Sequence, residues 1–196
     1  MSASGTPPAP STPARDERPA LSGWLPDAFA SLAELPGAKR FTPGQVRRWV
    51  FQRGATTFEQ MTDLSKDLRA ALGQRLRVRS SRLERVHASA DGTEGLLSRL
   101  DDDRLIESVL IPDAERTTLC ISSQVGCAVA CVFCASGLAG VERNLTAAEI
   151  VEQVLVARER CAPTNYVFMG SGEPTHNMAA VLQAINPSAL DHCMVA

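Results

Sequence analysis

This sequence of 196 residues lacks most features that would place it in a special class of protein. Residues 1–19 contain no apolar run that could form the core of a signal peptide. No segment repeats, and the composition, with 44% apolar and 21% charged residues, lacks the bias of disordered, collagen-like or coiled-coil chains. The sequence therefore predicts a globular protein of one large or two small domains.

Net charge is also nearly absent, because 20 Lys or Arg stand against 22 Asp or Glu. The resulting net charge of −2 gives no indication of a nucleic-acid partner. Residues 39–85, however, hold 12 basic and 4 acidic side chains, whereas residues 87–196 hold 6 and 14. A basic amino half of this kind is typical of a module that docks a polyanion. A solvated helix face is the alternative interpretation of the same cations.

Uncharged runs of about 20 residues or more, the length that could span a membrane, are missing with one exception, residues 117–141. Paired serines, three glycines and four cysteines interrupt this run, so we expect no membrane span. Because there is no secretory signal, the six cysteines are predicted to be thiols of a cytoplasmic protein rather than a disulfide framework.

Hydrophobic spacing predicts an α/β chain whose amino-terminal part is α+β. The expected helices are 42–54, capped by Thr42 and stopped by Gly54, and one that starts near Ser65 and carries the leucine stripe Leu64, Leu68, Leu72 and Leu76. Two more are expected at 146–160, opened by a capping box of Thr146 and Glu149, and from Asn177. The expected strands are 83–88, 96–100, 105–111 and 117–122, which form an antiparallel meander, and 166–169. We expect a flexible tail at 1–22, a helical domain at 23–80, antiparallel strands at 81–118 and the start of a parallel barrel or open sheet at 119–196.

The chemistry of the sequence is concentrated in a C-x3-C-x2-C motif formed by Cys127, Cys131 and Cys134. Three thiolates on one tight loop can hold an iron–sulfur cluster and leave one iron open, because an ordinary cluster takes four cysteines. The alternatives are a zinc site with Cys120 as fourth thiolate, or cysteines buried as small hydrophobic residues. The spacing differs from the paired C-x2-C knuckles of a zinc ribbon.

The same motif, with Phe133 before its last cysteine, resembles the signature of radical S-adenosylmethionine (SAM) enzymes. The surrounding block 118–127 resembles the RlmN/Cfr family of RNA adenine methyltransferases, as do residues 143–146 and 172–174. Residues 25–76 are similar to the helical amino-terminal domain of that family, so the resemblance covers most of the chain.

This resemblance implies a fold and a reaction. It implies the first βα units of a partial radical-SAM (β/α) barrel, a [4Fe-4S] cluster on the three cysteines, and cleavage of SAM to a 5′-deoxyadenosyl radical. It further implies an RNA-docking role for the helical domain and methylation of adenine in RNA. The RlmN branch, our default, modifies carbon 2 in large-subunit (23S) rRNA and in tRNA, whereas the Cfr branch modifies carbon 8. An electron donor for the cluster and a monomeric state are also expected.

Two residues match positions that act on RNA in this family. Cys120, which by itself would most often be a buried structural thiol, matches the cysteine that resolves the covalent RNA adduct by forming a disulfide. Glu107 matches the proposed acceptor of the adenine proton. Its predicted row contains Leu105, Val109 and Ile111, and aliphatic neighbours would disfavour the charged form of a carboxylate. A solubility charge on an edge strand is the common alternative for Glu107.

Gly172 and Glu173 match the family site for the methionine part of SAM. They follow directly after a predicted strand, where parallel α/β folds place their ligands, and glycine lets the backbone approach closely. Glu173 could accept hydrogen bonds from the ammonium group of SAM. By itself, a turn that ends in Gly-Glu-Pro is weak evidence.

The remaining length falls short of a complete barrel. Eight βα units take about 250 residues, whereas 77 residues run from Cys120 to Ala196. We expect the later strands and the methyl-carrying cysteine of the family to be missing, because the surroundings of Cys193 do not match that cysteine. One hypothesis is an amino-terminal portion of an RNA adenine methyltransferase that is inactive alone. The other is a non-catalytic iron–sulfur or RNA-binding remnant.

Overall fold

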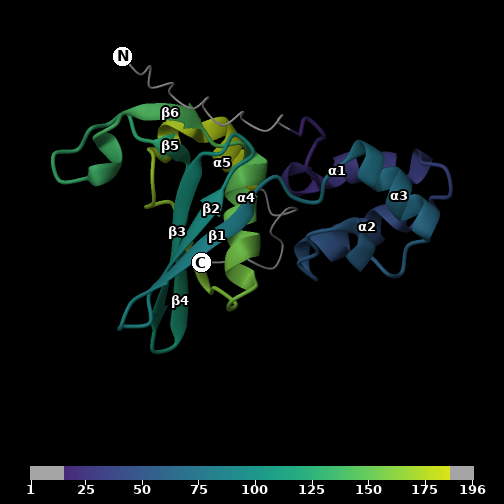
Figure 1. Cartoon of the computed structure of the whole chain (residues 1–196), viewed down its shortest axis with the longest axis horizontal. Helices are drawn as coiled ribbons and strands as arrows, with labels where there is room; N and C mark the ends of the chain where they lie inside the picture. The colour runs from purple at the N-terminus through teal and green to yellow at the C-terminus, as the bar shows by residue number, and fades with distance from the viewer. Residues whose placement is uncertain (1–15, 186–196) are drawn as a thin grey trace, which may run out of the picture.

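A computed structural model describes residues 16–185. Residues 23–78 form a helical module that lies to one side of a sheet (Figure 1). Its helices are α1 (Pro26–Phe29), α2 (Thr42–Phe51) and α3 (Lys66–Arg75), joined by short 3-10 turns. The predicted leucine stripe of α3 is buried in one core with apolar residues of α2, and this burial holds the short helices together.

The two helix starts expected near Thr42 and Ser65 differ in outcome. α3 begins directly after Ser65, as expected, and Ser65 is its N-cap, accepting the Leu68 N–H at 3.3 Å. The prediction that Thr42 caps α2 is wrong, because the N-cap is Phe41 and Thr42 is the first helical residue. The Thr42 hydroxyl accepts the Lys39 N–H at 2.9 Å instead, within a turn that the Thr42 N–H closes by donating to the Lys39 carbonyl.

Part of the expected tail is held in place. Residues 1–15 lie outside the described residues, but Leu21 and Ser22 are buried. Ala20 forms a parallel bridge with Arg77, and the Leu21 N–H donates to the Arg77 carbonyl at 2.9 Å. The entry to the helical module and the exit from it therefore lie side by side.

A five-stranded sheet with the order β1-β2-β3-β4-β7 follows. Its first four strands pair antiparallel, which confirms the predicted meander: β1 (Arg82–Ala88), β2 (Glu94–Arg99), β3 (Leu105–Asp113) and β4 (Arg116–Cys120). β7 (Asn165–Val167) pairs parallel to β4. A hairpin of β5 (Gln124–Gly126) and β6 (Val141–Asn144) forms a separate small sheet that the sequence pattern did not predict.

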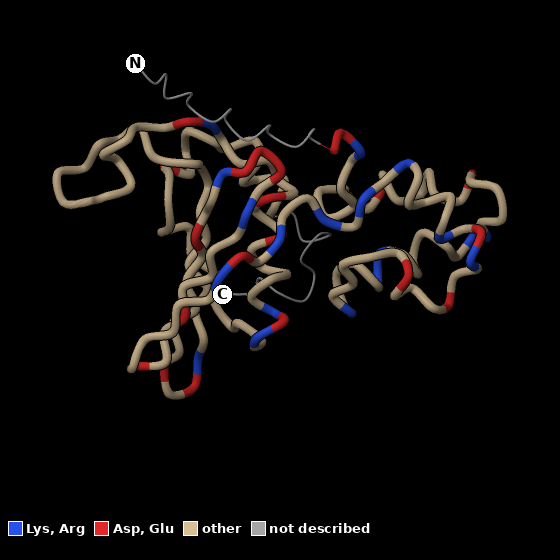
Figure 2. The backbone as a smooth tube through the Cα atoms, in the orientation of Figure 1, with Lys and Arg blue, Asp and Glu red and all other residues tan. Residues whose placement is uncertain are grey.

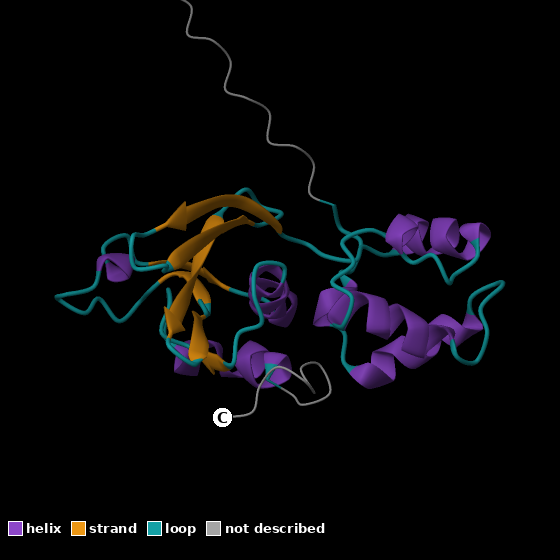
Figure 3. Cartoon of the chain, turned by 90° about the horizontal axis from the view of Figure 1, so that it is seen from below, coloured by secondary structure: helices purple, strands orange, loops and turns teal. Residues whose placement is uncertain are grey.

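Helix α4 (Ala147–Arg158) lies between this sheet and the helical module (Figures 1 and 3). Together with β4 and β7 it makes the first unit of a parallel α/β fold, as expected. Ten of its residues, Ala147 and 149–157, are buried. α5 (Met178–Ala184) packs against it. Within residues 16–185, no helix has the length and apolar character needed to cross a membrane.

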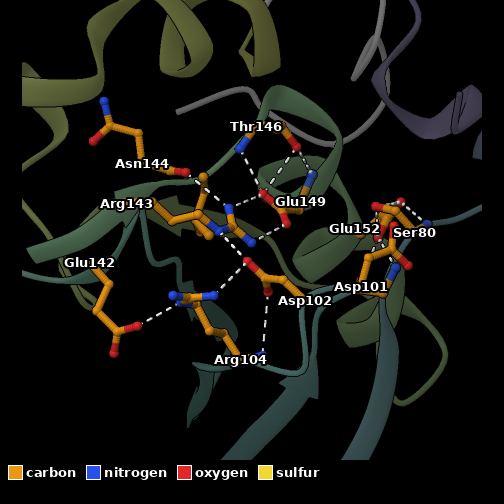
Figure 4. Close-up of polar contacts among 12 residues, drawn as sticks. Ser80, Asp101, Asp102, Arg104, Glu142, Arg143, Asn144, Thr146, Glu149 and Glu152 are labelled. Carbon is orange, nitrogen blue, oxygen red and sulfur yellow. Dashed lines mark hydrogen bonds and ion pairs between the residues drawn. The ribbon is translucent and has the colours of Figure 1, made fainter. Parts of the chain in front are cut away.

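Arg143 joins the hairpin, the sheet and α4 through charged hydrogen bonds (Figure 4). Its Nε donates to Asp102 Oδ2 at 2.6 Å, and its Nη1 and Nη2 donate to the Glu149 carboxylate at 2.9 and 2.7 Å. Glu149 also accepts the Thr146 N–H at 2.8 Å, which completes the predicted capping box. Burial is the largest influence on the pKa of Asp102 and would raise it, but the hydrogen bonds and positive charges of Arg143 and Arg104 together outweigh burial and lower the pKa.

We expect Arg143→Ala to lower the free energy of unfolding by about 2 kcal/mol, a value between those of exposed and buried ion pairs. The substitution leaves the buried Glu149 carboxylate without its bidentate partner. The measurement is urea unfolding followed by circular dichroism. Arg116→Ala is the matched control, because Arg116 pairs with Asp113 at 3.6 Å on the open surface. Equal losses of stability in the two variants would contradict this role of Arg143.

Candidate functional site

The cysteine motif lies on the loop that joins β5 to β6. The loop is closed at its base, where the Cys127 N–H donates to the Gly140 carbonyl at 3.1 Å. Inside it, the Cys134 N–H donates to the Cys131 carbonyl at 3.0 Å, and Ala130 takes a left-handed conformation with φ of 51°. Cys131 is exposed, and the other two cysteines are partly buried. The hairpin therefore holds three accessible thiols on one loop.

The donor set of this loop fits an iron–sulfur cluster. The three cysteines are free of disulfides, and thiolates are the ligands that such clusters take. Within residues 16–185, no three His, Cys, Asp or Glu side chains converge closely enough to hold a metal ion, so the loop presents the thiols without gathering them around one point. With only three thiolates as ligands, one iron of a bound cluster would stay open.

The loop after β7 is bound to the segment that leads into the cysteine motif. The Ser171 carbonyl accepts the N–H groups of Ser123 and Gln124 at 2.8 and 3.1 Å. In the other direction, the Ser171 N–H donates to Ser122 Oγ at 2.9 Å. Ser122 Oγ also donates to the Glu107 carbonyl at 2.6 Å, which extends the network to β3. The two loops are therefore fixed relative to each other.

Gln124 fixes Glu173 most directly. The Glu173 N–H donates to Gln124 Oε1 at 2.9 Å, and Gln124 Nε2 donates to Asn144 Oδ1 at 2.7 Å. Gly172 has a φ of 99°, and a β-carbon there would lie 2.5 Å from Gln124 Cβ. Position 172 therefore requires glycine for both its backbone conformation and its contact with Gln124.

The Glu173 carboxylate is partly exposed at the end of this loop. Its Oε1 accepts the Thr175 N–H at 3.0 Å and the Thr175 hydroxyl at 2.8 Å. The hydrogen bond from the Thr175 backbone, followed by that from its side chain, lowers the pKa of Glu173. Glu173 is therefore ionised at neutral pH and has acceptor capacity left for a ligand cation.

Glu107 and Cys120 lie on the sheet face opposite the one that packs toward α4. Cys120 pairs with Val109, two residues along β3 from Glu107, so the two residues are diagonal neighbours, which in ordinary sheets stand roughly 7–8 Å apart. Glu107 Oε1 lies over Gly95, 2.6 Å from where a β-carbon would be. The aliphatic surroundings expected for Glu107 are not found, because Glu107 itself and two of the three aliphatic residues in its row are exposed.

Cys120 is partly buried between β3 and β7. Burial raises the pKa of its thiol, and a hydrogen bond with the Met169 backbone offsets the rise in part. The neutral thiol is therefore the resting form at neutral pH, and a nearby base must remove its proton before it can act as a nucleophile.

Sequence patterns missed the residues that support this site. Gln153 of α4 pairs with the Ser122 backbone, accepting its N–H and donating to its carbonyl at 2.9 Å each. Asn177 Nδ2 donates to the Ser123 and Leu145 carbonyls at 2.8 Å each. One sequence signal for such partners was the polar run 122–124 directly after an apolar strand. Because buried polar groups are hydrogen-bonded, a buried run of this kind predicts polar side chains elsewhere in the chain that bind it.

Comparisons with known proteins agree with this arrangement. The family model of the ribosomal RNA large subunit methyltransferase N-terminal domain matches residues 23–78, and that of the radical SAM superfamily matches residues 121–189. Two relatives are the dual-specificity RNA methyltransferases RlmN of Geobacter sulfurreducens and Syntrophotalea carbinolica, 49% identical over 149 and 183 residues. These alignments cover 76% and 91% of this chain but 41% and 49% of the relatives.

A crystal structure of a radical SAM methyltransferase from Sphaerobacter thermophilus has the same fold. It matches with a TM-score of 0.81 and 38% identity, over 89% of this chain and 52% of that one. This match confirms the expected partial radical-SAM fold. The chain spans about half the length of the relatives that it matches.

The raised pKa of Cys120 leads to a test of its reactivity. We expect alkylation of Cys120 by iodoacetamide to increase with pH through a midpoint above the value of about 8.5 that is typical of a free cysteine. At pH 7.5 its rate should fall below that of an unstructured cysteine peptide, because less thiolate is present. Peptide mapping by mass spectrometry on the iron-free chain separates Cys120 from the other thiols. A midpoint at or below that of the peptide would contradict this assignment.

Proposed function

The chain belongs to the RlmN family of radical SAM methyltransferases, and we propose that it supplies the cluster-binding and RNA-docking half of an enzyme that methylates adenine in RNA. The observation that carries this proposal is the network through Ser122 and Gln124. It joins the cysteine loop to the Gly172-Glu173 loop, so an open cluster iron and a methionine-binding carboxylate would face one ligand.

Cys127, Cys131 and Cys134 would hold a [4Fe-4S] cluster in this proposal. When bound and reduced, the cluster supplies the electron that cleaves SAM to a 5′-deoxyadenosyl radical. Glu173 accepts hydrogen bonds from the SAM ammonium, and Gly172 lets the backbone approach the ligand. Gln124 keeps Glu173 in place through the 2.9 Å bond from its N–H.

Glu107 and Cys120 would act on the RNA from the open sheet face. Glu107, exposed on β3, takes the proton from the adenine carbon. The Cys120 thiolate attacks the sulfur of the methyl-carrying cysteine of the complete enzyme and forms a disulfide with it. The bond from that sulfur to the RNA-bound carbon breaks, its electron pair stays with the carbon, and the carbon takes a proton to give the methylated RNA. Because burial raises the pKa of the Cys120 thiol, little thiolate is present at rest.

The substrate that fits best is adenine carbon 2 in large-subunit rRNA and in tRNA, in the cytoplasm. This choice follows the relatives, which are named dual-specificity RNA methyltransferases. The helical module contributes the basic side chains that would contact phosphates, since blue segments recur along it (Figure 2). Phosphate contacts of this kind position RNA without reading its sequence.

The cluster assignment is tested by anaerobic reconstitution with iron and sulfide. We expect one cubane cluster per chain, with an electron paramagnetic resonance signal in the reduced state that shifts when SAM is added. Alanine at any of the three loop cysteines should abolish the cluster, whereas Cys161→Ala should leave it unchanged because Cys161 lies outside the loop. Zinc in place of iron, or a signal indifferent to SAM, would refute the proposed chemistry.

RNA docking is tested by the salt dependence of binding to an rRNA or tRNA oligonucleotide. We expect the double variant Arg40→Glu/Lys66→Glu, in which both wild-type side chains are exposed, to bind about 10-fold more weakly at low salt. Its slope of log affinity against log salt should also be shallower. Arg116→Glu, exposed on the sheet, is the control and should bind normally. Equal affinities for the two variants would remove the helical module from RNA docking.

A further inference from the structure

Glu152 lies at the middle of α4 and is fully buried, and none of the proposed chemistry uses it. Its hydrogen-bond donors are the hydroxyl of Ser22 and the hydroxyls and backbone N–H groups of Ser80 and Ser81. The Ser80 and Ser81 N–H groups donate at 2.7 and 2.6 Å, and the Ser22 hydroxyl at 2.5 Å. One carboxylate therefore accepts from five neutral donors. Figure 4 shows Ser80 beside Glu152.

These donors come from the two segments that connect the helical module to the rest of the chain. Ser22 stands at the entry to the module, and Ser80 and Ser81 follow its exit. The entry and exit are already paired with each other through Ala20 and Arg77. Glu152 therefore fastens both connections at a single point on α4.

The hydrogen bonds to Glu152 require their donors to lie in particular directions, whereas apolar packing does not. A buried carboxylate is stable only where donors surround it, and displacement of either segment would remove the donors that this segment supplies. Burial raises the pKa of Glu152, and the hydrogen bonds from Ser22, Ser81 and Ser80 offset part of the rise. The carboxylate thus selects one placement of Ser80 and Ser81.

Two arginines make further contacts that agree with one fixed placement. Arg158 of α4 donates from Nη1 to the carbonyl of Phe51, the last residue of α2, at 2.7 Å. Arg79, at the exit of the module, donates from Nη2 to the Gly54 carbonyl at 2.9 Å and from Nη1 to Glu159 Oε1, just after α4, at 2.5 Å. The sheet on the other side of α4 carries Glu107 and Cys120, so α4 separates the RNA-docking module from the catalytic face (Figure 3).

We propose that Glu152 is a positioning residue that fixes the orientation of the helical module relative to the sheet face of Glu107 and Cys120. This inference rests on the proposed function, because the orientation matters where one RNA touches both parts. When the module is held in place, an RNA that contacts its basic side chains is already positioned to contact the sheet, so the two contacts reinforce each other. When the module moves freely, the effective concentration of the RNA at the sheet falls and the combined affinity is lower.

The test is Glu152→Gln in the 196-residue chain, reconstituted with iron and sulfide. A glutamine amide keeps one acceptor oxygen and replaces the other with an NH2 donor, so one of the two backbone N–H groups, that of Ser80 or that of Ser81, loses its acceptor. We expect the amide hydrogen exchange of the group that loses its acceptor to rise at least about 10-fold and RNA affinity to fall about 10-fold. Iron per chain and the SAM-induced spectral shift should stay at wild-type values. Unchanged exchange at Ser80 and Ser81 would overturn the proposal.

Two controls separate positioning from stability. Leu72→Ala, in the core of the helical module, destabilises that module without touching the connection, so it should leave exchange at Ser80 and Ser81 unchanged. Glu115→Gln changes an exposed carboxylate in the turn between β3 and β4, away from the module connections, and should retain RNA affinity. If Glu152→Gln fails to fold, Ser22→Ala and Ser81→Ala each remove one donor hydroxyl and should give smaller increases in exchange.

The outcomes also distinguish this inference from the proposed function. A wild-type chain that binds neither cluster nor RNA refutes the proposed function, while the exchange measurement still tests the anchoring by Glu152. Increased exchange with unchanged RNA affinity, in a wild-type chain that binds RNA, would show anchoring without positioning and would overturn the proposal.

Discussion

Buried polar side chains must be hydrogen-bonded, and the consequences of this constraint converge on helix α4. Glu149, Glu152 and Gln153 are all buried there, and each reaches a different part of the chain. Glu149 holds the hairpin through Arg143, Gln153 holds the strand end at Ser122, and Glu152 holds the connections of the helical module. A helix of aliphatic residues alone could fill the same space, but it would not fix these three parts in direction.

The candidate site is built by contacts between segments that are far apart in sequence. The run 122–124 ends one strand and leads to the cysteine loop, while Ser171 and Glu173 follow the neighbouring parallel strand, 49 residues later. Parallel pairing brings these strand ends to one edge of the sheet. Backbone hydrogen bonds from Ser123 and Gln124 to Ser171 then set the spacing between the loops, and the side chains of Ser122 and Gln124 hold Ser171 and Glu173 in place.

Local features of this fold could be predicted from the sequence, and long-range ones could not. The Ser65 cap and the Thr146–Glu149 capping box follow from residues three apart, and the meander follows from alternation. Thr42 failed as a cap because a turn at Lys39 took its hydroxyl. Resemblance to a family located the cysteines and Glu173. The buried role of Glu152 could not be predicted, because a glutamate in a helix is usually solvated and its hydrogen-bond donors lie 71 or more residues away in the sequence.

Because Ala20 pairs with Arg77, the helical module is an insertion whose two ends lie side by side. Because the chain leaves and returns at one place, the module can vary in length or be exchanged without a change in the path of the sheet or of the cysteine loop. Under the proposed function, RNA docking and the chemistry at the cysteine loop would then be separable in evolution. A module with a different binding preference would need only to present hydrogen-bond donors to Glu152 where it leaves and rejoins the rest of the chain.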